Sequence, residues 1–149
     1  MSVTVTPHIA CRDAAKALEF YQKAFGAEVL CAHKMPDGKI MHSAINIRGA
    51  TVFVVDEFPD CGGKSPQALG GTPVTLHLQV PDVDATFKRA VDAGATVRMP
   101  VADMFWGDRY GIVIDPFGHQ WSVATTIRKV SAEELQAAAA QMHMAGAKG

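Results

Sequence analysis

Short segments of alternating or β-branched apolar residues recur along the chain and predict strands. The predicted strands cover residues 3–11, 28–35, 39–48, 51–57, 73–80, 95–101, 110–114 and 119–126. Two further segments, each between the first and second strand of a set, carry apolar residues at helical spacing. Asp13 and Asp82 stand where the N-caps of such helices are expected, and Gly26 and Gly94 stand where the helices end. The order strand, helix and three strands is therefore predicted twice.

The two sets of elements are also related in sequence. His8 falls on His77 at a shift of 69 residues (77 − 8 = 69), and the turn at 46–49 falls on the turn at 115–118 at the same shift. In the helical segment, one residue of the first copy has no counterpart in the second. A single long period of this kind indicates duplicated modules. The expected fold class is α+β, with two tandem βαβββ modules whose mixed sheets pair into one curved sheet around a cleft.

The chain divides into four parts. Residues 1–57 form the first module and residues 73–126 the second. Residues 58–72, rich in glycine, proline and small polar residues, are the predicted linker. In the C-terminal part, 127–149, a capping-box pattern precedes an alanine-rich run and predicts a helix over about 132–142. We expect that helix to pack on the body or across a subunit contact.

Strand periodicity assigns side chains to the two faces of each sheet. In the first module, the apolar Ile45 is expected under the helix, which leaves His42 in the cleft. In the second module, Ile112 and Ile114 take the place under the helix. The residues of that strand then left inside the cleft are Arg109, Gly111 and Val113. The complete set of predicted ligand-binding residues is Thr6, His8, His42, Phe53, Thr75, His77, Trp106, Arg109 and Ser122.

This set combines histidines, hydroxyls, an arginine and aromatic rings, which suits a small organic ligand. Trp106 is expected to stack on the ligand, and Arg109 to fix an anionic or carbonyl group. Alternatively, Trp106 seals a hydrophobic edge and Asp108 pairs with a neighbouring arginine. The sequence leaves both interpretations open.

The histidines raise the question of a metal. His8 and His77 are related by the repeat and are expected across a pseudo-twofold axis. Catalytic metal sites often combine histidines with a carboxylate. Alternation places Glu57 on the cleft face of its strand, but at the strand's end. A divalent metal on His8, His77 and Glu57 is one interpretation. A cleft without a metal or other cofactor is the other.

Composition narrows the range of partners. The formal net charge is −1, the pI is near 6.6, and no long run of lysine or arginine occurs, so we expect no nucleic acid. No apolar run has the length of a membrane span and no leader pattern occurs, so we expect no membrane and a cytoplasmic location. The widely spaced Cys11, Cys31 and Cys61 are predicted to be free thiols in a reducing compartment.

Two motifs carry a family resemblance: CRDAAKALEFYQKAFGAEV near the start and DPFGHQWSV near the end. With the duplicated modules, they make residues 3–126 similar to the vicinal oxygen chelate superfamily of glyoxalase I, bleomycin-resistance proteins and extradiol dioxygenases. The resemblance implies an eight-stranded paired fold, usually a homodimer, with the ligand site in the cleft.

Glyoxalase-like members of that superfamily bind a divalent metal from the first and fourth strand of each module. The matching positions here hold neither histidine nor glutamate; they are Thr6, Phe53, Thr75 and Ser122. Bleomycin-resistance members lack the metal and sequester a bulky drug. The resemblance therefore implies a small-molecule-binding homodimer of the antibiotic-sequestration type, without the usual chelate. The alternative is a metal-dependent lyase, isomerase or dioxygenase with a displaced metal site.

Overall fold

The computed structural model describes residues 2–148, with side chains described as far as Met142. The elements of the first module are β1 (His8–Cys11), α1 (Ala14–Phe25), β2 (Glu28–Lys34), β3 (Ile40–Ile47) and β4 (Ala50–Asp56). Those of the second module are β5 (Thr75–Gln79), α3 (Val83–Ala93), β6 (Thr96–Asp103), β7 (Asp108–Ile114) and β8 (Gln120–Thr126). The other helices are η1 (Pro59–Cys61), α2 (Pro66–Leu69) and α4 (Ala132–Lys148).

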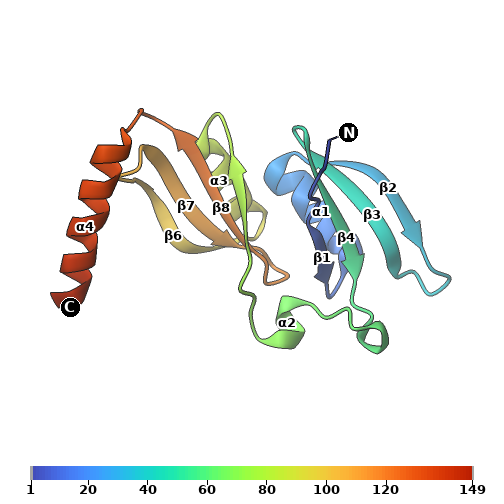
Figure 1. The fold of residues 1–149 in the computed structure, drawn as a ribbon. Helices are drawn as coiled ribbons and strands as arrows, with labels where there is room; N and C mark the ends of the chain where they lie inside the picture. The colour runs from blue at the N-terminus through green and yellow to red at the C-terminus, as the bar shows by residue number, and fades with distance from the viewer. Residues whose placement is uncertain (1, 149) are drawn as a thin grey trace.

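The strands form two four-stranded sheets, ordered β1-β4-β3-β2 and β5-β8-β7-β6. The first and fourth strands of each module run parallel and the other neighbours run antiparallel, so both sheets are mixed. Figure 1 shows the two sheets beside one another, with α1 and α3 near their junction. The α+β class with two βαβββ modules is confirmed.

The helices begin and end where the sequence predicts. Asp13 accepts a hydrogen bond from the backbone N–H of Lys16 (3.1 Å) at the start of α1, and Asp82 does the same for Ala85 (3.1 Å) at the start of α3. Gly26 adopts φ 68° after α1, a left-handed conformation that glycine reaches without a steric cost. Local capping therefore accounts for the limits of both helices.

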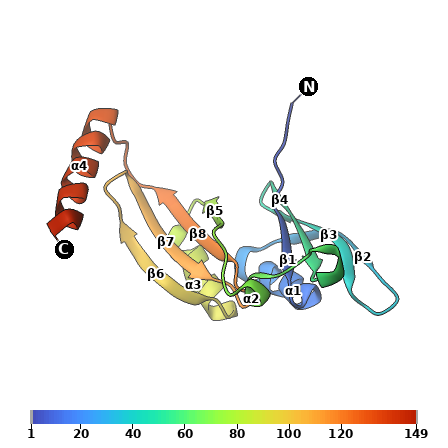
Figure 2. The same cartoon turned by 60° about the horizontal axis from the view of Figure 1, so that its bottom comes forward.

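The first strand is shorter than expected. Its prediction covered residues 3–11, but pairing begins only where the N–H of Phe53 donates to the carbonyl oxygen of Pro7 (2.8 Å). The preceding segment leaves the body of the protein (Figure 2). Val3 and Val5 in that segment are 90% and 93% exposed. The alternating pattern is present there, but a strand needs a partner to which it can hydrogen bond.

The two modules share one core on the helix-facing sides of their sheets. The Trp121 ring of β8 packs against Tyr21 and Phe25 of α1, with centroid distances of 5.4 and 4.9 Å. The buried carboxylate of Asp115 accepts hydrogen bonds from the Tyr21 hydroxyl (2.5 Å) and the Trp121 indole N–H (2.9 Å). Burial and then the Asp115 charge raise the pKa of Tyr21 well above its ordinary value, so the hydroxyl stays a donor.

The repeat is not in constant register through the third strands. The β4 residue Phe53 lies opposite Ala44 of β3, whereas Ser122, its counterpart in β8, lies opposite Ile112 of β7. Phe53 and Ser122 are 69 residues apart (122 − 53), whereas the residues opposite them, Ala44 and Ile112, are 68 apart (112 − 44). One cause is a bulge: His33 and Lys34 pair with His42 and Ile40, so Met41 is an extra residue in β3.

The C-terminal helix α4 exists as predicted and extends further, to Lys148. It stands off from the sheets beyond β6 and β7 (Figure 1), so it does not pack on the body along its length. Leu135 and Ala138 are half-buried, while Met142 is 57% exposed. None of the described helices combines the length and apolar character required to cross a bilayer.

Candidate functional site

Side chains of the first module form a line of rings on the sheet face that points away from α1. The Phe53 ring has His8 on one side and His42 on the other, at centroid distances of 6.0 and 4.9 Å and in edge-on geometry. His42 in turn stacks with His33 of β2 at 6.1 Å and 15°. We call this set, His33, His42, Phe53 and His8, the ring row. Its rings offer flat aromatic surface together with polar nitrogens.

The corresponding face of the second module is organised by hydrogen bonds. Nδ1 of His77 lies 2.7 Å from the Ser122 hydroxyl, and Nε2 lies 2.8 Å from Oε1 of Gln79. The Gln79 amide donates onward to the Thr126 hydroxyl (2.9 Å). Thr75 accepts from the Gln120 amide (2.7 Å) on the same face. Its polar side chains are therefore held by one another.

An aromatic pair borders this polar face. Tyr110 of β7 stacks with His77 at 6.1 Å and 19°, and Trp106 meets Tyr110 edge-on at 5.4 Å. The Trp106 indole donates to Asp108 (3.2 Å), so Trp106 belongs to the face while Asp108 orients it. Sequence reasoning missed Tyr110 because it put the wrong residues of β7 on this face.

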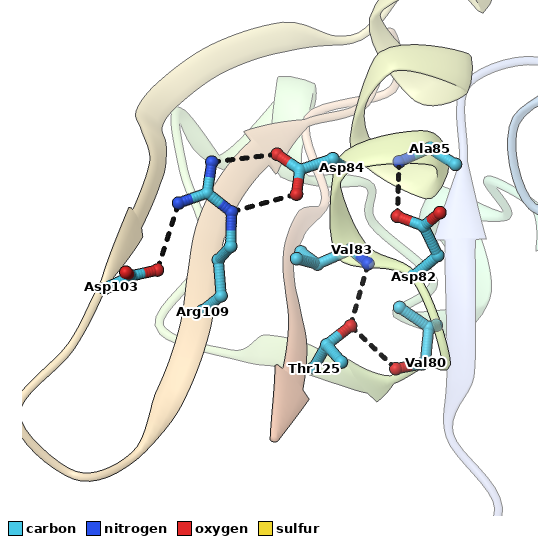
Figure 3. A network of polar contacts seen from close by, with 8 residues as sticks. All are labelled: Val80, Asp82, Val83, Asp84, Ala85, Asp103, Arg109 and Thr125. Atoms are coloured by element: carbon cyan, nitrogen blue, oxygen red, sulfur yellow. Dashed lines mark hydrogen bonds and ion pairs between the residues drawn. The ribbon is translucent and has the colours of Figure 1, made fainter. Parts of the chain in front are cut away.

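Arg109 was expected in the cleft and lies on the opposite side of the sheet. It pairs with both carboxylate oxygens of Asp84 on α3 (2.9 and 3.0 Å) and with Asp103 of β6 (3.0 Å), as Figure 3 shows. Hydrogen bonds from Arg109 hold the pKa of Asp84 below its ordinary value. The arginine links the start of α3 to β6 and β7.

Gly111 and Val113 were placed wrongly for the same reason. A Cβ on Gly111 would lie 2.8 Å from the Phe87 ring of α3, and Val113 is fully buried in the shared core. Ile112, expected under the helix, lies opposite Ser122 on the other face. Because side chains alternate, a one-residue difference in register exchanges the two faces of a strand.

The four positions that the family resemblance assigns to metal ligands hold other side chains here. Phe53 belongs to the ring row, and Ser122 is 2% exposed and hydrogen bonded to His77. Thr6 and Thr75 supply hydroxyl groups. Among the described residues, no three histidine, cysteine, aspartate or glutamate side chains come together as a metal site would require.

The displaced metal set is likewise not assembled within one chain. Glu57 accepts hydrogen bonds from the backbone N–H (3.1 Å) and the hydroxyl of Ser65, and it pairs with Arg12 at 3.6 Å. These contacts, led by the Ser65 hydroxyl, lower the pKa of Glu57. The carboxylate therefore anchors the linker, whereas His77 is engaged by Ser122 and Gln79.

Contacts between the modules come from the helix-facing sides and the linker. Arg89 of α3 donates to the Lys23 carbonyl oxygen at the end of α1 (2.5 Å), and His119 Nε2 lies 2.8 Å from the Ala10 carbonyl oxygen. The ring contacts of the ring row and of Tyr110 each stay within one module. The structure thus presents two chemically different sheet faces on modules joined through one core.

Comparison with known proteins matches this arrangement. Residues 3–123 match the model of the Glyoxalase/Bleomycin resistance protein/Dioxygenase superfamily. The Mycobacterium bovis protein Mb0911c is 54% identical over 137 residues, covering 90% of each chain. The crystal structure of TioX from Micromonospora sp. ML1 is 26% identical, covers 85% of this chain and 100% of TioX, and superposes with a TM-score of 0.66. The Arabidopsis thaliana At5g48480 product, 28% identical, covers 83% of this chain and 99% of its own, also at 0.66.

The family match extends through both modules, and the shared fold agrees with it. This chain belongs to the Glyoxalase/Bleomycin resistance protein/Dioxygenase superfamily, and the family resemblance read from its motifs is confirmed.

Proposed function

We propose that this protein binds a small organic molecule with aromatic surface on its open sheet faces, without the usual metal chelate. The observation that carries the proposal is the ring row. Phe53 stands at one of the positions that the family resemblance assigns to a metal ligand, and it lies between His8 and His42. Such a surface binds flat, partly polar molecules by stacking and edge contacts.

The polar face of the second module supplies the other half of the proposed site. His77, Ser122 and Gln79 are pre-organised by their mutual hydrogen bonds, while Trp106 and Tyr110 add stacking surface. A ligand with both aromatic and hydrogen-bonding groups fits this combination. Sequestration of an antibiotic is a function of this kind, consistent with a family that includes bleomycin-resistance proteins.

We also propose a cytoplasmic homodimer. The cysteines Cys11, Cys31 and Cys61 are free, which fits a reducing compartment. Val3, Val5 and Met142 are exposed apolar residues on segments that leave the body, and a second copy of the chain would cover such residues. Sedimentation equilibrium is expected to give twice the chain mass; a monomer at every concentration would contradict this part.

A thermal-shift screen of planar aromatic compounds and bleomycin, followed by calorimetric titration of those that stabilise, tests ligand binding. Phe53→Ala is expected to weaken binding at least about tenfold, because the ring supplies the stacking surface. Tyr110→Ala tests the second face, and Ile127→Ala, at a residue 47% exposed, is the matched control. Absence of any stabilising compound, or equal loss in all three variants, would refute the proposal.

Metal content decides between this function and a metal-dependent enzyme. In the enzyme, a second copy would have to bring His77 toward His8 and Glu57, which one chain keeps apart. Protein purified without a histidine tag is expected to contain no stoichiometric divalent ion. A bound ion whose removal by chelator lowers thermal stability would replace the proposed function with metal-dependent lyase, isomerase or dioxygenase chemistry.

A further inference from the structure

A cavity of about 610 Å³ lies along the free edge of β1, between that edge, the linker and β5. Its floor includes Ala10 and Val55, and its walls come from the linker and from Leu76. The volume falls within the range of pockets that hold small molecules. Of the ring row, only His8 lines the cavity, whereas Phe53, His42 and His33 do not. The cavity therefore lies beside the ring row and has its own lining.

The walls contain apolar side chains that are largely exposed to solvent. Leu69 at the end of α2 is 64% exposed and Val74 is 58% exposed, and both line the cavity. Together with Pro66, Leu76 and Val55 they form an apolar lining around the space. A ligand with an apolar body would remove this surface from water and gain the corresponding hydrophobic free energy.

The linker wall is fixed to both modules. Ser65 is fully buried and bonded to Glu57, at the end of the β4 segment. On the other side, the hairpin before β8 packs closely on α2: a Cβ on Gly118 would lie 2.9 Å from Cβ of Pro66. Gly118 also has φ 90°, so a side chain there is doubly excluded. The cavity is therefore preformed, which lowers the entropy cost of binding.

Charge at the cavity has one sign. Among the described residues that line the cavity, Lys64 is the only lysine, arginine, aspartate or glutamate. The neighbouring carboxylate, Glu57, is turned to Ser65 and Arg12. An anionic group on a ligand would therefore meet Lys64 and no acidic side chain in the lining.

We propose that this cavity is a second binding site, for a small molecule with an apolar body and one negative charge, such as a medium-chain or aromatic carboxylate. The apolar body lies against Leu69, Val74 and Leu76, and the carboxylate lies at Lys64. The site goes beyond the proposed binding on the sheet faces and does not depend on it.

Calorimetric titration of the full chain with decanoate tests the proposal, with decyltrimethylammonium as the probe of equal chain length and opposite charge. Decanoate is expected to bind and the ammonium compound to bind at least about fivefold more weakly. Lys64→Glu should raise the decanoate Kd about fivefold, and Leu69→Asp about tenfold, since it removes apolar contact and adds a negative charge. Both residues are exposed, so both variants are expected to fold.

Lys34→Glu and Leu30→Asp, at exposed positions of β2, are the matched controls and should leave the decanoate Kd unchanged. Equal affinity for both probes, no binding of decanoate, or equal effects in the controls would overturn the proposal. Phe53→Ala separates the two sites: it should weaken the aromatic ligand and leave decanoate unaffected. Loss of decanoate binding in Phe53→Ala, with none in Leu69→Asp, would assign decanoate to the ring row and refute the second site.

Discussion

The two hairpin turns that correspond in the repeat perform very different tasks. In the first module, Asn46 starts a tight turn at the surface, where its side chain accepts a hydrogen bond from the N–H of Gly49 (2.8 Å). In the second module, Asp115 holds its own turn through the N–H groups of Phe117 and His119 (both 2.9 Å). Its second oxygen is buried and receives Tyr21 from the other module.

One residue of loop length separates these outcomes. Asn46 pairs with Thr51 and encloses four residues, 47–50, whereas the matching pair, Ile114 and Gln120, encloses five, 115–119. The longer loop folds its aspartate inward, against the shared core. A turn that is only local in one copy has become the junction of the modules in the other. The two copies thus share a framework, while turns that differ by one residue make different contacts.

The largest expected effect comes from removing the buried carboxylate. Asp115→Ala leaves the donors of Tyr21, Trp121 and the turn without their acceptor, and we expect a loss of about 3 kcal/mol or more in the free energy of unfolding. Asn46→Ala, the matched change in the other turn, should cost about 1 kcal/mol or less, because its bond is local and solvent can replace it. Urea denaturation measures both. Similar losses in the two variants would show that the turns are equivalent after all.

A smaller effect is expected from the partner of Asp115. Tyr21→Phe should cost about 1.5 kcal/mol at neutral pH, since it leaves an acceptor of the buried carboxylate unfilled. Folding raises the pKa of Tyr21, so its contribution is complete below the ordinary tyrosine pKa of about 10 and is lost as the pH rises above that value.

Stability measured from pH 8 to 11 checks this dependence. The wild type is expected to lose more stability than Tyr21→Phe over that range. Cys11 contributes in the same direction in both proteins, because burial raises the pKa of its thiol. Tyr110→Phe, on the open face, is the control and should follow the wild type. Parallel curves for the wild type and Tyr21→Phe would contradict the role of the Tyr21 hydroxyl.

The sequence was sufficient for the framework, because its signals are local. Asp13 and Gly26 mark a helix by their own side-chain and backbone chemistry, and the long repeat reveals the duplication. The positions of the side chains on β7 were not predictable in this way. Met41 and the longer second turn each change the register by one residue, and their effects cancel beyond the hairpin. The repeat therefore has a shift of 69 before Met41 and after the second turn but a shift of 68 along β7 from Tyr110, and the sequence alone does not reveal the change.

The same limit applied to the site. His8 and His42 were placed by alternation along their own strands, and Phe53 by its match to Ser122, where the shift of 69 holds. Tyr110 was missed and Arg109 was included because the apolar Ile112 and Ile114 were assigned to the helix-facing side of β7. A half-buried isoleucine on an open face and an arginine on a helix-facing side both contradict a hydropathy pattern. The arginine is stable there because Asp84 and Asp103 neutralise its charge at the edge of the core.

The smallest effect is expected from replacing Arg109, at which the two modules differ. In the strand register, Arg109 of β7 lies opposite Asp103, and Ile40 of β3 lies opposite Lys34. Arg109 and Ile40 are therefore counterparts, and Arg109→Ile gives the second module the residue of the first. We expect a small loss of stability at low salt that shrinks at 1 M NaCl, because exposed ion pairs are screened. Since Arg109 points to α3, affinity for an aromatic ligand of the open face should not change. Thermal denaturation at both salt concentrations and titration of the ligand measure the two outcomes. A variant of full stability that loses the ligand would place the arginine in the binding site, as the sequence pattern alone suggests.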